Sequence, residues 1–478
     1  MDVFRPVARE DNSNQNKRVK ASQKPDKPLV PIKQKICPFI DYSREEQLKL
    51  KETNCREIIT KTKAKILEKE CAKIIIRQNW LKNADSIEQI MQPIAHENES
   101  GSSYRNKTEY TISKDPEDGR IKVGFVVGRK AEFEYVIVDR DPSIPFISPV
   151  SAYIAEQIES ILNKLKEEQP EPECDEFDAY NQNTRRGCHR FLLVKESECY
   201  NELIVKLVGS YGNEKVKESV VSALKSFGET FNFGDVKLVG LAIENHQGFS
   251  SCVPNDPQHE VLVFGERSYL YEKVMGLKFK IPFGAFFQVH TKLSEILYEN
   301  IKDLMQIDSS TVLLDICAGT GTMGLILGKE ASEIIFIESE KASCDTIAEN
   351  IQRNTDEGNL TEWKAKVKIL NKKIEDCIEE ITTEYSGKGL RVVAIVDPPR
   401  AGLHPSVVTS LRTFRGLDEL VFVSCDFSQG SDNLTKLCCE ESRKCRGPPF
   451  SPISVRPVDI FPATNHYETL VYMKRLYE

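Results

Sequence analysis

The stretch LLDICAGTGTMG, residues 313–324, follows an apolar run and leads into a helical pattern. Its glycines Gly319 and Gly321 allow the backbone to turn tightly and to approach a ligand closely. A glycine-rich turn between a strand and a helix is typical of nucleotide-binding α/β folds, although the GxGxxG pattern by itself has low specificity. We therefore expect a ligand to bind at this turn.

Short apolar runs recur around this turn. Helical stretches separate them, as expected for strands buried on both faces of a parallel sheet, and the runs span residues 311–316, 334–338, 367–370, 392–397 and 420–425. The patterns at 454–462 and 468–475 predict a closing pair of strands, antiparallel at one edge. Residues 284–478 are thus predicted to form an α/β, Rossmann-like domain with a doubly wound, mostly parallel sheet.

Three segments precede this domain. Residues 96–283 alternate strands with a few helices, which predicts an α+β domain with an antiparallel sheet. Residues 41–95 are predicted to be helical, and a capping-box-like Ser43-Arg-Glu-Glu opens the helix. Residues 1–40 are expected to be a disordered basic arm, in which KRVK at 17–20 is a candidate nuclear signal or RNA tether.

The overall composition excludes several classes of protein. The chain has 478 residues with 65 Lys or Arg and 73 Asp or Glu, so its formal net charge is −8, and RNA binding would need a local basic groove. No apolar run is long enough to cross a membrane, and the N-terminus lacks the apolar core of a secretory signal. The 14 cysteines are scattered without paired CxxC motifs. We therefore expect no metal or iron–sulfur cluster, and a cytoplasmic or nuclear location with reduced thiols.

Carboxylates decide between two ligands at the glycine-rich turn. Glu338 ends the next strand, where an acid can bind ribose hydroxyls of either a dinucleotide or S-adenosylmethionine. Asp315 lies four residues before Gly319, and Asp397 of VDPPR is expected to face the same edge of the sheet. Their negative charge opposes phosphates and suits a cationic sulfonium, so the pattern favours S-adenosylmethionine.

Three further residues are candidates for chemistry or binding. Cys425 lies just past an apolar strand, where a thiol can face the cleft instead of packing as a small apolar residue, and Arg400 is a candidate cation beside it. Glu468, beside His466, is a carboxylate that could take a proton from carbon if it is partly desolvated. Gln288, in the aromatic loop PFGAFFQVHT, could hydrogen-bond a ligand or a base.

Taken together and in this order, the motifs resemble those of the uracil-5 RNA methyltransferase family. The resemblance extends over residues 100–478 and rests on YRNKTEY, FFQVH, DICAGTGTMG, DPPRAGL, VSC and FPATNHYE. It implies an S-adenosylmethionine-dependent methyltransferase of class I fold that makes 5-methyluridine in tRNA, with position 54 of the T loop as the expected target. It also implies a role for each candidate: Cys425 as the nucleophile at C6, Glu468 as the base that removes the C5 proton, and Gln288, Gly319, Glu338 and Asp397 as cofactor-binding residues.

The chain departs from the family pattern at three places. Asp426-Phe427 follows the cysteine where Asn-Pro is common, and an acid there is expected to raise the pKa of the thiol. His290 replaces an asparagine, and Ala463 stands where a histidine is frequent. Two alternatives stay open: a weakly active or inactive tRNA-binding protein on the same fold, and an N-directed nucleic-acid methyltransferase, because DPPR is similar to the DPPY-type loop.

Overall fold

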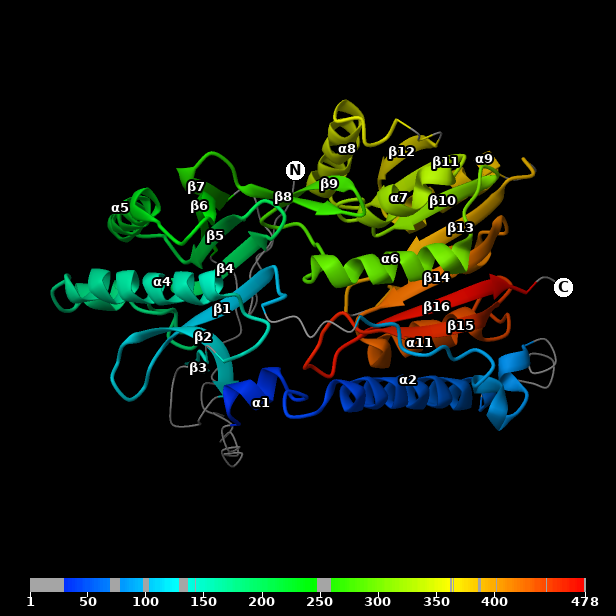
Figure 1. Ribbon diagram of the computed structural model, residues 1–478, viewed down its shortest axis with the longest axis horizontal. Coiled ribbons are helices and arrows are strands. Elements are labelled where there is room, and N and C mark those ends of the chain that lie inside the picture. The colour runs from blue at the N-terminus through cyan, green and yellow to red at the C-terminus, as the bar shows by residue number, and fades with distance from the viewer. Residues whose placement is uncertain are drawn as a thin grey trace, which may run out of the picture.

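The computed structural model describes residues 30–68, 78–97, 103–128, 136–141, 143–246, 259–361, 365–385, 388–400, 402–443 and 445–476, together with residue 363. Two large sheets lie side by side in the molecule, and a long N-terminal helix runs along one side (Figure 1). The KRVK segment and most of the expected basic arm lie outside the described residues.

The C-terminal sheet has seven strands in the order β12-β11-β10-β13-β14-β16-β15. The strands are β10 (Thr311–Ile316), β11 (Glu333–Glu338), β12 (Lys366–Asn371), β13 (Arg391–Val396), β14 (Leu417–Ser424), β15 (Phe450–Val458) and β16 (Glu468–Arg475). The first five are parallel, whereas β16 is antiparallel to both β14 and β15. The predicted doubly wound sheet with a closing antiparallel pair is therefore confirmed.

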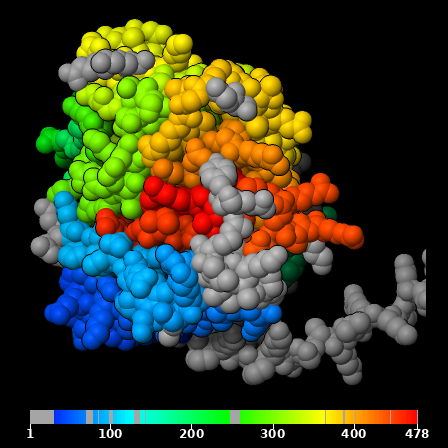
Figure 2. All heavy atoms as spheres, turned by 90° about the vertical axis from the view of Figure 1, so that its right-hand side faces the viewer, coloured from blue at the N-terminus to red at the C-terminus, as the bar shows by residue number. Residues whose placement is uncertain are grey.

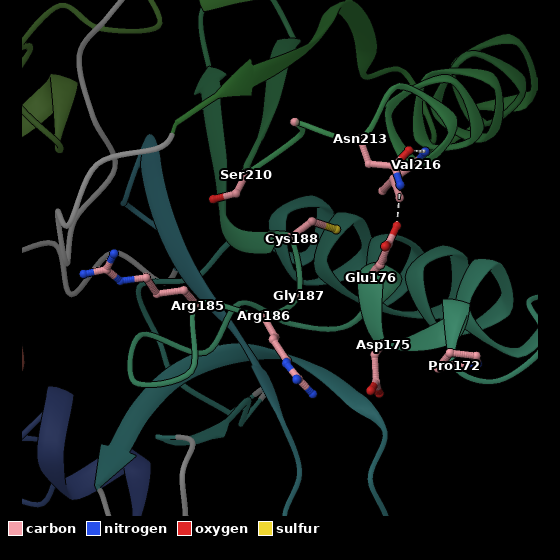
Figure 3. Close-up of a pocket in the computed structure, with 11 residues that line it drawn as sticks. Pro172, Asp175, Glu176, Arg185, Arg186, Gly187, Cys188, Ser210, Asn213 and Val216 are labelled. Atoms are coloured by element: carbon pink, nitrogen blue, oxygen red, sulfur yellow. Dashed lines mark hydrogen bonds between the residues drawn. The ribbon is translucent and has the colours of Figure 1, made fainter.

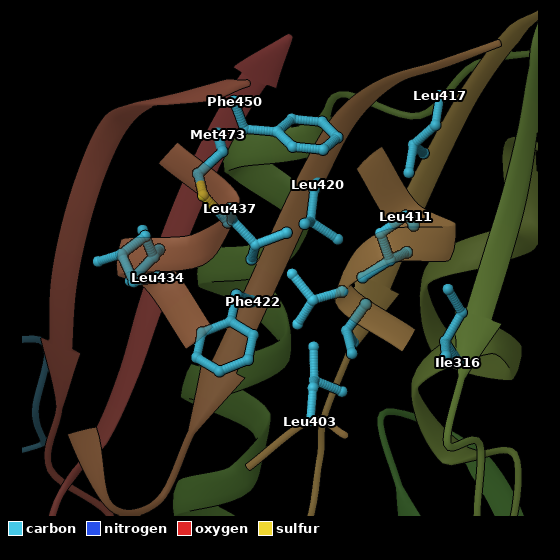
Figure 4. Packing of buried hydrophobic residues seen from close by; sticks show 14 of the residues in the cluster. Ile316, Leu403, Leu411, Leu417, Leu420, Phe422, Leu434, Leu437, Phe450 and Met473 are labelled. Atoms are coloured by element: carbon cyan, nitrogen blue, oxygen red, sulfur yellow. The ribbon is translucent and has the colours of Figure 1, made fainter. Parts of the chain in front are cut away.

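Helices cover both faces of this sheet (Figure 1). They are α6 (Thr291–Met305), α7 (Thr322–Leu327), α8 (Lys341–Asp356), α9 (Ile374–Tyr385), α10 (Pro405–Thr413) and α11 (Phe427–Cys438). One face packs through buried residues that include Leu420, Phe422, Leu434 and Leu437 (Figure 4). Because the central strands are buried on both faces, they consist almost entirely of aliphatic residues.

The second sheet belongs to the central region and has the order β3-β2-β1-β4-β5-β6-β7. Its strands are β1 (Lys107–Lys114), β2 (Ile121–Gly128), β3 (Ile137–Asp139), β4 (His189–Ser197), β5 (Glu202–Gly209), β6 (Lys237–Asn245) and β7 (Glu260–Gly265), and the helices α4 (Pro149–Glu167) and α5 (Glu214–Thr230) cover one face. The expectation of a purely antiparallel sheet was wrong at one point, since β5 and β6 are parallel. Parallel neighbours need a crossover connection, which α5 supplies.

A hairpin of β8 (Tyr269–Val274) and β9 (Leu277–Pro282) joins the two sheets. Two fully buried asparagines of α8 hold it: Asn350 accepts the backbone N–H of Lys280 at 2.7 Å, and Asn354 accepts that of Lys278 at 2.8 Å. The apolar side chains of β9 are buried in the same core as α6 and α8. The hairpin thus packs against both sheets, since Leu270 of β8 lies in a buried cluster with Leu193 and Ile204 of the central sheet.

The N-terminal segment packs against the C-terminal sheet. Helix α2 (Arg44–Leu67) begins with the predicted capping box between Ser43 and Glu46 and packs against α11. In the space-filling view the N-terminal segment lies against the strands at the C-terminal end (Figure 2). Met91 and Ala95 form parallel bridges with Val455 and Val458, so this segment extends the edge of the sheet.

Two expectations for the N-terminal region need correction. The helical pattern was expected to continue to residue 95, but α2 ends at Leu67, and residues 78–97 form short 3-10 turns and extended backbone. The predicted disordered arm comprises residues 1–40, but helix α1 (Ile32–Ile36) lies within this range. Burial of Ile32 and Cys37 against Phe146 orders this part of the arm. Among the described residues, no helix is long and apolar enough to span a membrane.

Candidate active site

The predicted site residues lie at one edge of the C-terminal sheet. Cys425 directly follows β14, and Glu468 begins β16. Because β14 and β16 are antiparallel and Ser424 pairs with Thr469, the next residues along each strand, Cys425 and Glu468, lie across from each other. Asp397 follows the neighbouring parallel strand β13 and reaches the same edge.

The Cys425 thiol is half-buried in an acidic environment. Burial and the charges of Glu468 and Asp397 raise its pKa to about 11, while the nearby Arg400 guanidinium acts in the opposite direction. The sequence had singled out Arg400 as the cation beside this thiol. In the ligand-free protein the thiol is therefore mostly protonated at neutral pH, and a nearby positive charge would favour the thiolate.

Asp426 has a structural role at the start of α11. Its carboxylate caps the helix by accepting the backbone N–H of Gln429 at 3.2 Å and the side-chain amide of the same residue at 2.9 Å. The neighbouring Phe427 is buried in the core. The raised pKa of Cys425 thus arises from burial, Glu468 and Asp397, whereas Asp426 points its carboxylate into the helix turn.

Glu468 is a buried carboxylate with an unused oxygen. Its side chain is only 2% exposed, and its Oε2 atom has no hydrogen-bond partner among the described residues. Burial and the charge of Asp397 raise its pKa well above the ordinary value, and Arg400 opposes this effect. A desolvated carboxylate with a free oxygen beside a thiol is suited to accept a proton from a bound substrate.

The glycine-rich turn lies at the ends of β10 and β11. Cys317, Gly319 and Gly321 all have positive φ angles, so the turn is built from left-handed conformations. The Gly319 N–H donates to the Glu338 carboxylate at 3.0 Å, and nothing lies within 4 Å of the position that a Gly319 side chain would take. The turn therefore faces open space beside an acidic residue.

Asp315 supports this turn from below. Its carboxylate accepts the Gly324 N–H at 2.8 Å and is 3% exposed. Burial raises its pKa to about 7, and the charges of Asp397 and Glu338 act in the same direction. Burial also raises the pKa of Asp397 to about 7. These carboxylates, together with Glu468, make the site strongly acidic and suited to a cationic ligand.

The loop that carries Gln288 is fixed by the central region. The Asn106 side chain donates to the Gln288 carbonyl at 2.9 Å, and its backbone N–H donates to the Val289 carbonyl at 2.8 Å. The buried Lys195 donates to the carbonyls of Pro282 and Ala285, both at 2.8 Å. Gln288 itself is 4% exposed. These bonds hold the loop at the junction of the two sheets.

The motif YRNKTEY contributes to structure. The Tyr104 ring stacks on His290 with 4.7 Å between ring centroids, and its hydroxyl donates to the Pro462 carbonyl at 3.0 Å. His290 in turn caps α6 by accepting the Leu293 N–H. Tyr104 and Asn106 thus connect loops of the site, and the residues that follow them, from Lys107, begin β1.

Sequence reasoning missed two residues near the site. Tyr298 of α6 is fully buried, and burial raises its pKa, with the charges of Asp397, Asp315 and Glu468 acting in the same direction. The second is Lys51 of α2, which binds Asp459 and the Phe461 carbonyl in the segment before Glu468. It lies 408 residues before Asp459, so no local sequence pattern indicated this contact. Of the loop phenylalanines, Phe283 and Phe287 are buried, but Phe286 is 63% exposed beside Gln288.

His466 is exposed at the rim of this site, with its ring edge-on to Phe461 and the charges of Arg400 and Asp426 nearby. A cavity of about 490 Å³ lies in the central region, lined by Arg185, Arg186, Cys188 and Ser210 among others (Figure 3). None of the predicted site residues lines it. Among the described residues no group of three or more His, Cys, Asp or Glu side chains is arranged to bind a metal ion.

Comparisons with known proteins give the family. The sequence model of the family described as tRNA (Uracil-5-)-methyltransferase matches residues 197–476. The chain is 26% identical over 457 residues to human tRNA (uracil-5-)-methyltransferase homolog A, covering 94% of this chain and 68% of the relative. It is 28% identical over 451 residues to human homolog B, covering 92% of this chain and 83% of the relative.

A solved structure has the same fold. It is Pyrococcus abyssi tRNA (uracil-54, C5)-methyltransferase in complex with S-adenosyl-L-homocysteine, with a TM-score of 0.58 and 18% identity, covering 91% of this chain and 85% of that one. This similarity bears out the predicted class I methyltransferase fold. Because the family model covers more than half of the sequence, the chain belongs to the tRNA (uracil-5-)-methyltransferase family, a family of S-adenosylmethionine-dependent enzymes.

Proposed function

We propose that this enzyme methylates C5 of uridine 54 in the T loop of tRNA, with Cys425 as the nucleophile and Glu468 as the base. One observation carries the proposal: the register of β14 and β16 brings a thiol and a buried carboxylate with an unpartnered oxygen across from each other. A similar protein acts on uracil 54 according to its description, which supports this choice of nucleotide. With tRNA as its substrate, we expect the enzyme to be located in the cytoplasm or the nucleus.

The residues around the glycine-rich turn fit S-adenosylmethionine. We assign Gln288, Gly319, Glu338 and Asp397 to its binding. Gly319 faces open space and donates to the Glu338 carboxylate, Asp397 ends the neighbouring strand at the same edge of the sheet, and Gln288 is assigned from the family resemblance. S-adenosylmethionine supplies an electrophilic methyl group on a positively charged sulfur. A cation at this position is complementary to the acidic cluster, and its charge would favour the thiolate form of Cys425.

The first part of the proposed reaction activates the pyrimidine ring. C5 of uracil is a weak nucleophile, so a covalent step is needed. The Cys425 thiolate forms a bond from Sγ to C6, and the electrons of the C5=C6 double bond move into an enolate. C5 then takes the methyl group as the donor's carbon–sulfur bond breaks, leaving the thioether product and an adduct that carries both a hydrogen and a methyl group at C5.

The second part releases the product. Glu468 removes the C5 proton, the electrons of the C–H bond restore the C5=C6 double bond, and the bond from C6 to Sγ breaks to give back the thiolate. A general base must be ionised to act, and burial of Glu468 makes its carboxylate a stronger base than an exposed one. In this scheme Cys425 and Glu468 act at different steps.

The target base must leave the stack of the tRNA loop to reach the thiol. Phe286 presents its ring to solvent in the same loop as Gln288 and is the exposed aromatic side chain nearest in sequence to a cofactor residue. We assign it to RNA contact, since exposed aromatic rings stack on unpaired bases.

The experiment is methylation of a tRNA transcript that lacks modification, followed by nucleoside mass spectrometry and mapping of the modified fragment. We expect 5-methyluridine at position 54 with the intact enzyme and none with Cys425→Ala. Methylation at another nucleotide would overturn the T-loop assignment. Full activity of Cys425→Ala would overturn the covalent mechanism and favour an N-directed methyltransferase.

A further inference from the structure

Helix α2 holds the loop that leads into the proposed base, Glu468. We propose that Lys51, with Gln47, is a positioning residue for Glu468: it fixes residues 459–467, here called the terminal loop, so that the carboxylate meets the substrate in the product-release step. The inference rests on the proposed function, since it assigns a role to a helix outside the residues that the family model matches.

The first contact is a buried ion pair at the start of the terminal loop. The Lys51 ammonium donates to Asp459 Oδ1 at 2.7 Å and to the Phe461 carbonyl at 2.9 Å. Lys51 is 1% exposed and Asp459 is fully buried. Arg44, about two helical turns before Lys51 on α2, also pairs with Asp459. A buried ion pair with this many partners fixes geometry more than it adds stability.

The second contact is at the middle of the loop. The Gln47 side chain accepts the Ala463 N–H at 2.9 Å, and the Phe39 N–H donates to the Ala463 carbonyl at 3.1 Å. Ala463 has a φ of 62°, a left-handed conformation that residues other than glycine rarely adopt. The N-terminal segment thus holds both backbone polar groups of a strained residue.

The third contact is adjacent to the base itself. The Tyr467 hydroxyl donates to Asn54 Oδ1 at 2.7 Å, and Tyr467 immediately precedes Glu468. Gln47, Lys51 and Asn54 are spaced by four and three residues, so they lie on one face of α2. That face therefore binds the terminal loop at its start, its middle and its end.

A purely structural role for this face predicts a different outcome from a positioning role. If the contacts only stabilise the fold, breaking them lowers the melting temperature and slows all steps together. If they position Glu468, breaking them slows proton removal and release while the earlier attack by Cys425 continues. The covalent adduct between enzyme and tRNA then accumulates, which is a signal that loss of stability alone does not produce.

The experiment compares four variants of the full-length enzyme. Gln47→Leu removes the bond to Ala463, together with the bonds that the Gln47 amide donates to the Phe39 and Tyr42 carbonyls, and leaves no charge. Lys51→Met with Asp459→Asn removes both members of the buried pair, because a lone buried charge would destabilise the fold, and the remaining partner of Asp459, Arg44, has a side chain that is 21% exposed. Glu468→Gln is the reference for a lost base. Lys49→Met is the matched control, since Lys49 lies on the same helix and is exposed. Each is incubated with unmodified tRNA and S-adenosylmethionine, and the adduct on denaturing gels, the rate of 5-methyluridine release and the melting temperature are measured.

We expect Gln47→Leu and the double variant to accumulate adduct as Glu468→Gln does, with release slowed about tenfold or more, as small misplacements of catalytic groups can cause. Lys49→Met should match the wild type. Release at the wild-type rate, or adduct formation and release that fall by the same factor, would overturn the positioning role. If Glu468→Gln itself releases product normally, the assignment of the base fails instead, and the two failures are distinct.

Discussion

Asp315→Asn should stabilise the ligand-free enzyme more at pH 8 than at pH 5. Asp315 is buried behind the glycine-rich turn, and burial together with the charges of Asp397 and Glu338 raises its pKa from 3.8 to about 7. Asparagine has nearly the same shape, and its carbonyl can still accept the Gly324 N–H that Asp315 accepts at 2.8 Å. The substitution therefore removes a charge and keeps the contact.

The sign and size follow from linkage between protonation and folding. Because the pKa is higher in the folded state, Asp315 holds a proton there that the unfolded chain releases above pH 4, so stability falls as the pH rises from about 4 to about 7. The whole difference between 3.8 and about 7 corresponds to about 4 kcal/mol. The part that lies between pH 5 and pH 8 corresponds to about 2 to 3 kcal/mol.

Thermal melts of the wild type and Asp315→Asn at both pH values provide the assay. The gap in melting temperature should be wider at pH 8 by about 2 to 3 °C, taking about 1 °C per kcal/mol for a chain of 478 residues. Other titrating groups are present in both proteins and cancel in the comparison. An equal gap at pH 5 and pH 8 would refute the idea that Asp315 is a buried carboxylate with a raised pKa.

Four further predictions concern single residues. Gly324→Ala places a Cβ 2.4 Å from the Phe336 ring, so it should destabilise the fold by about 1 to 3 kcal/mol, and an unchanged melting temperature would contradict this. The Cβ of Gly319→Ala meets no atom within 4 Å, so we expect a smaller loss of stability, about 1 kcal/mol from the positive φ. The same variant should bind S-adenosylmethionine more weakly in calorimetry, and wild-type affinity would show that the ligand does not use the space above the turn. Because the pKa of Cys425 is about 11, kcat/KM should rise between pH 7 and pH 9, by at most about tenfold per pH unit, whereas a flat profile would indicate that thiolate formation does not limit the rate. Phe286→Ala should raise KM for tRNA while kcat is kept, and the opposite pattern would remove Phe286 from RNA contact.

The fold of the C-terminal half could be predicted because its signals are local. Strands buried on both faces leave uninterrupted apolar runs, and the glycine-rich turn marks where β10 ends. The same locality explains the errors. The helical pattern continues in the sequence after Leu67, but Met91 and Ala95 form bridges with Val455 and Val458. A local pattern cannot predict this pairing, because the partners lie more than 360 residues away.

In the candidate site too, the residues at strand ends could be predicted, whereas those that act through distant contacts could not. Cys425 and Asp397 stand at the carboxyl ends of predicted parallel strands, and Glu468 begins the predicted antiparallel strand, so their common edge follows from the topology of the sheet. Lys51 could not be found, because it acts on a backbone carbonyl 410 residues away and has no sequence signature that distinguishes it from an ordinary surface lysine. The motif YRNKTEY contains Asn106 but does not show that its amide binds the Gln288 carbonyl, 182 residues away.

The bond between the Cys425 sulfur and a pyrimidine can be measured directly. The enzyme is incubated with S-adenosylmethionine and tRNA that contains 5-fluorouracil, a base with fluorine in place of hydrogen at C5. Because Glu468 cannot remove fluorine as a proton, the proposed covalent adduct should persist. Mass spectrometry should find the intact enzyme heavier by the methylated RNA, with the modification on the peptide that carries Cys425 and none in Cys425→Ala. The absence of an adduct from the active enzyme, or its attachment to another cysteine, would contradict the proposed mechanism.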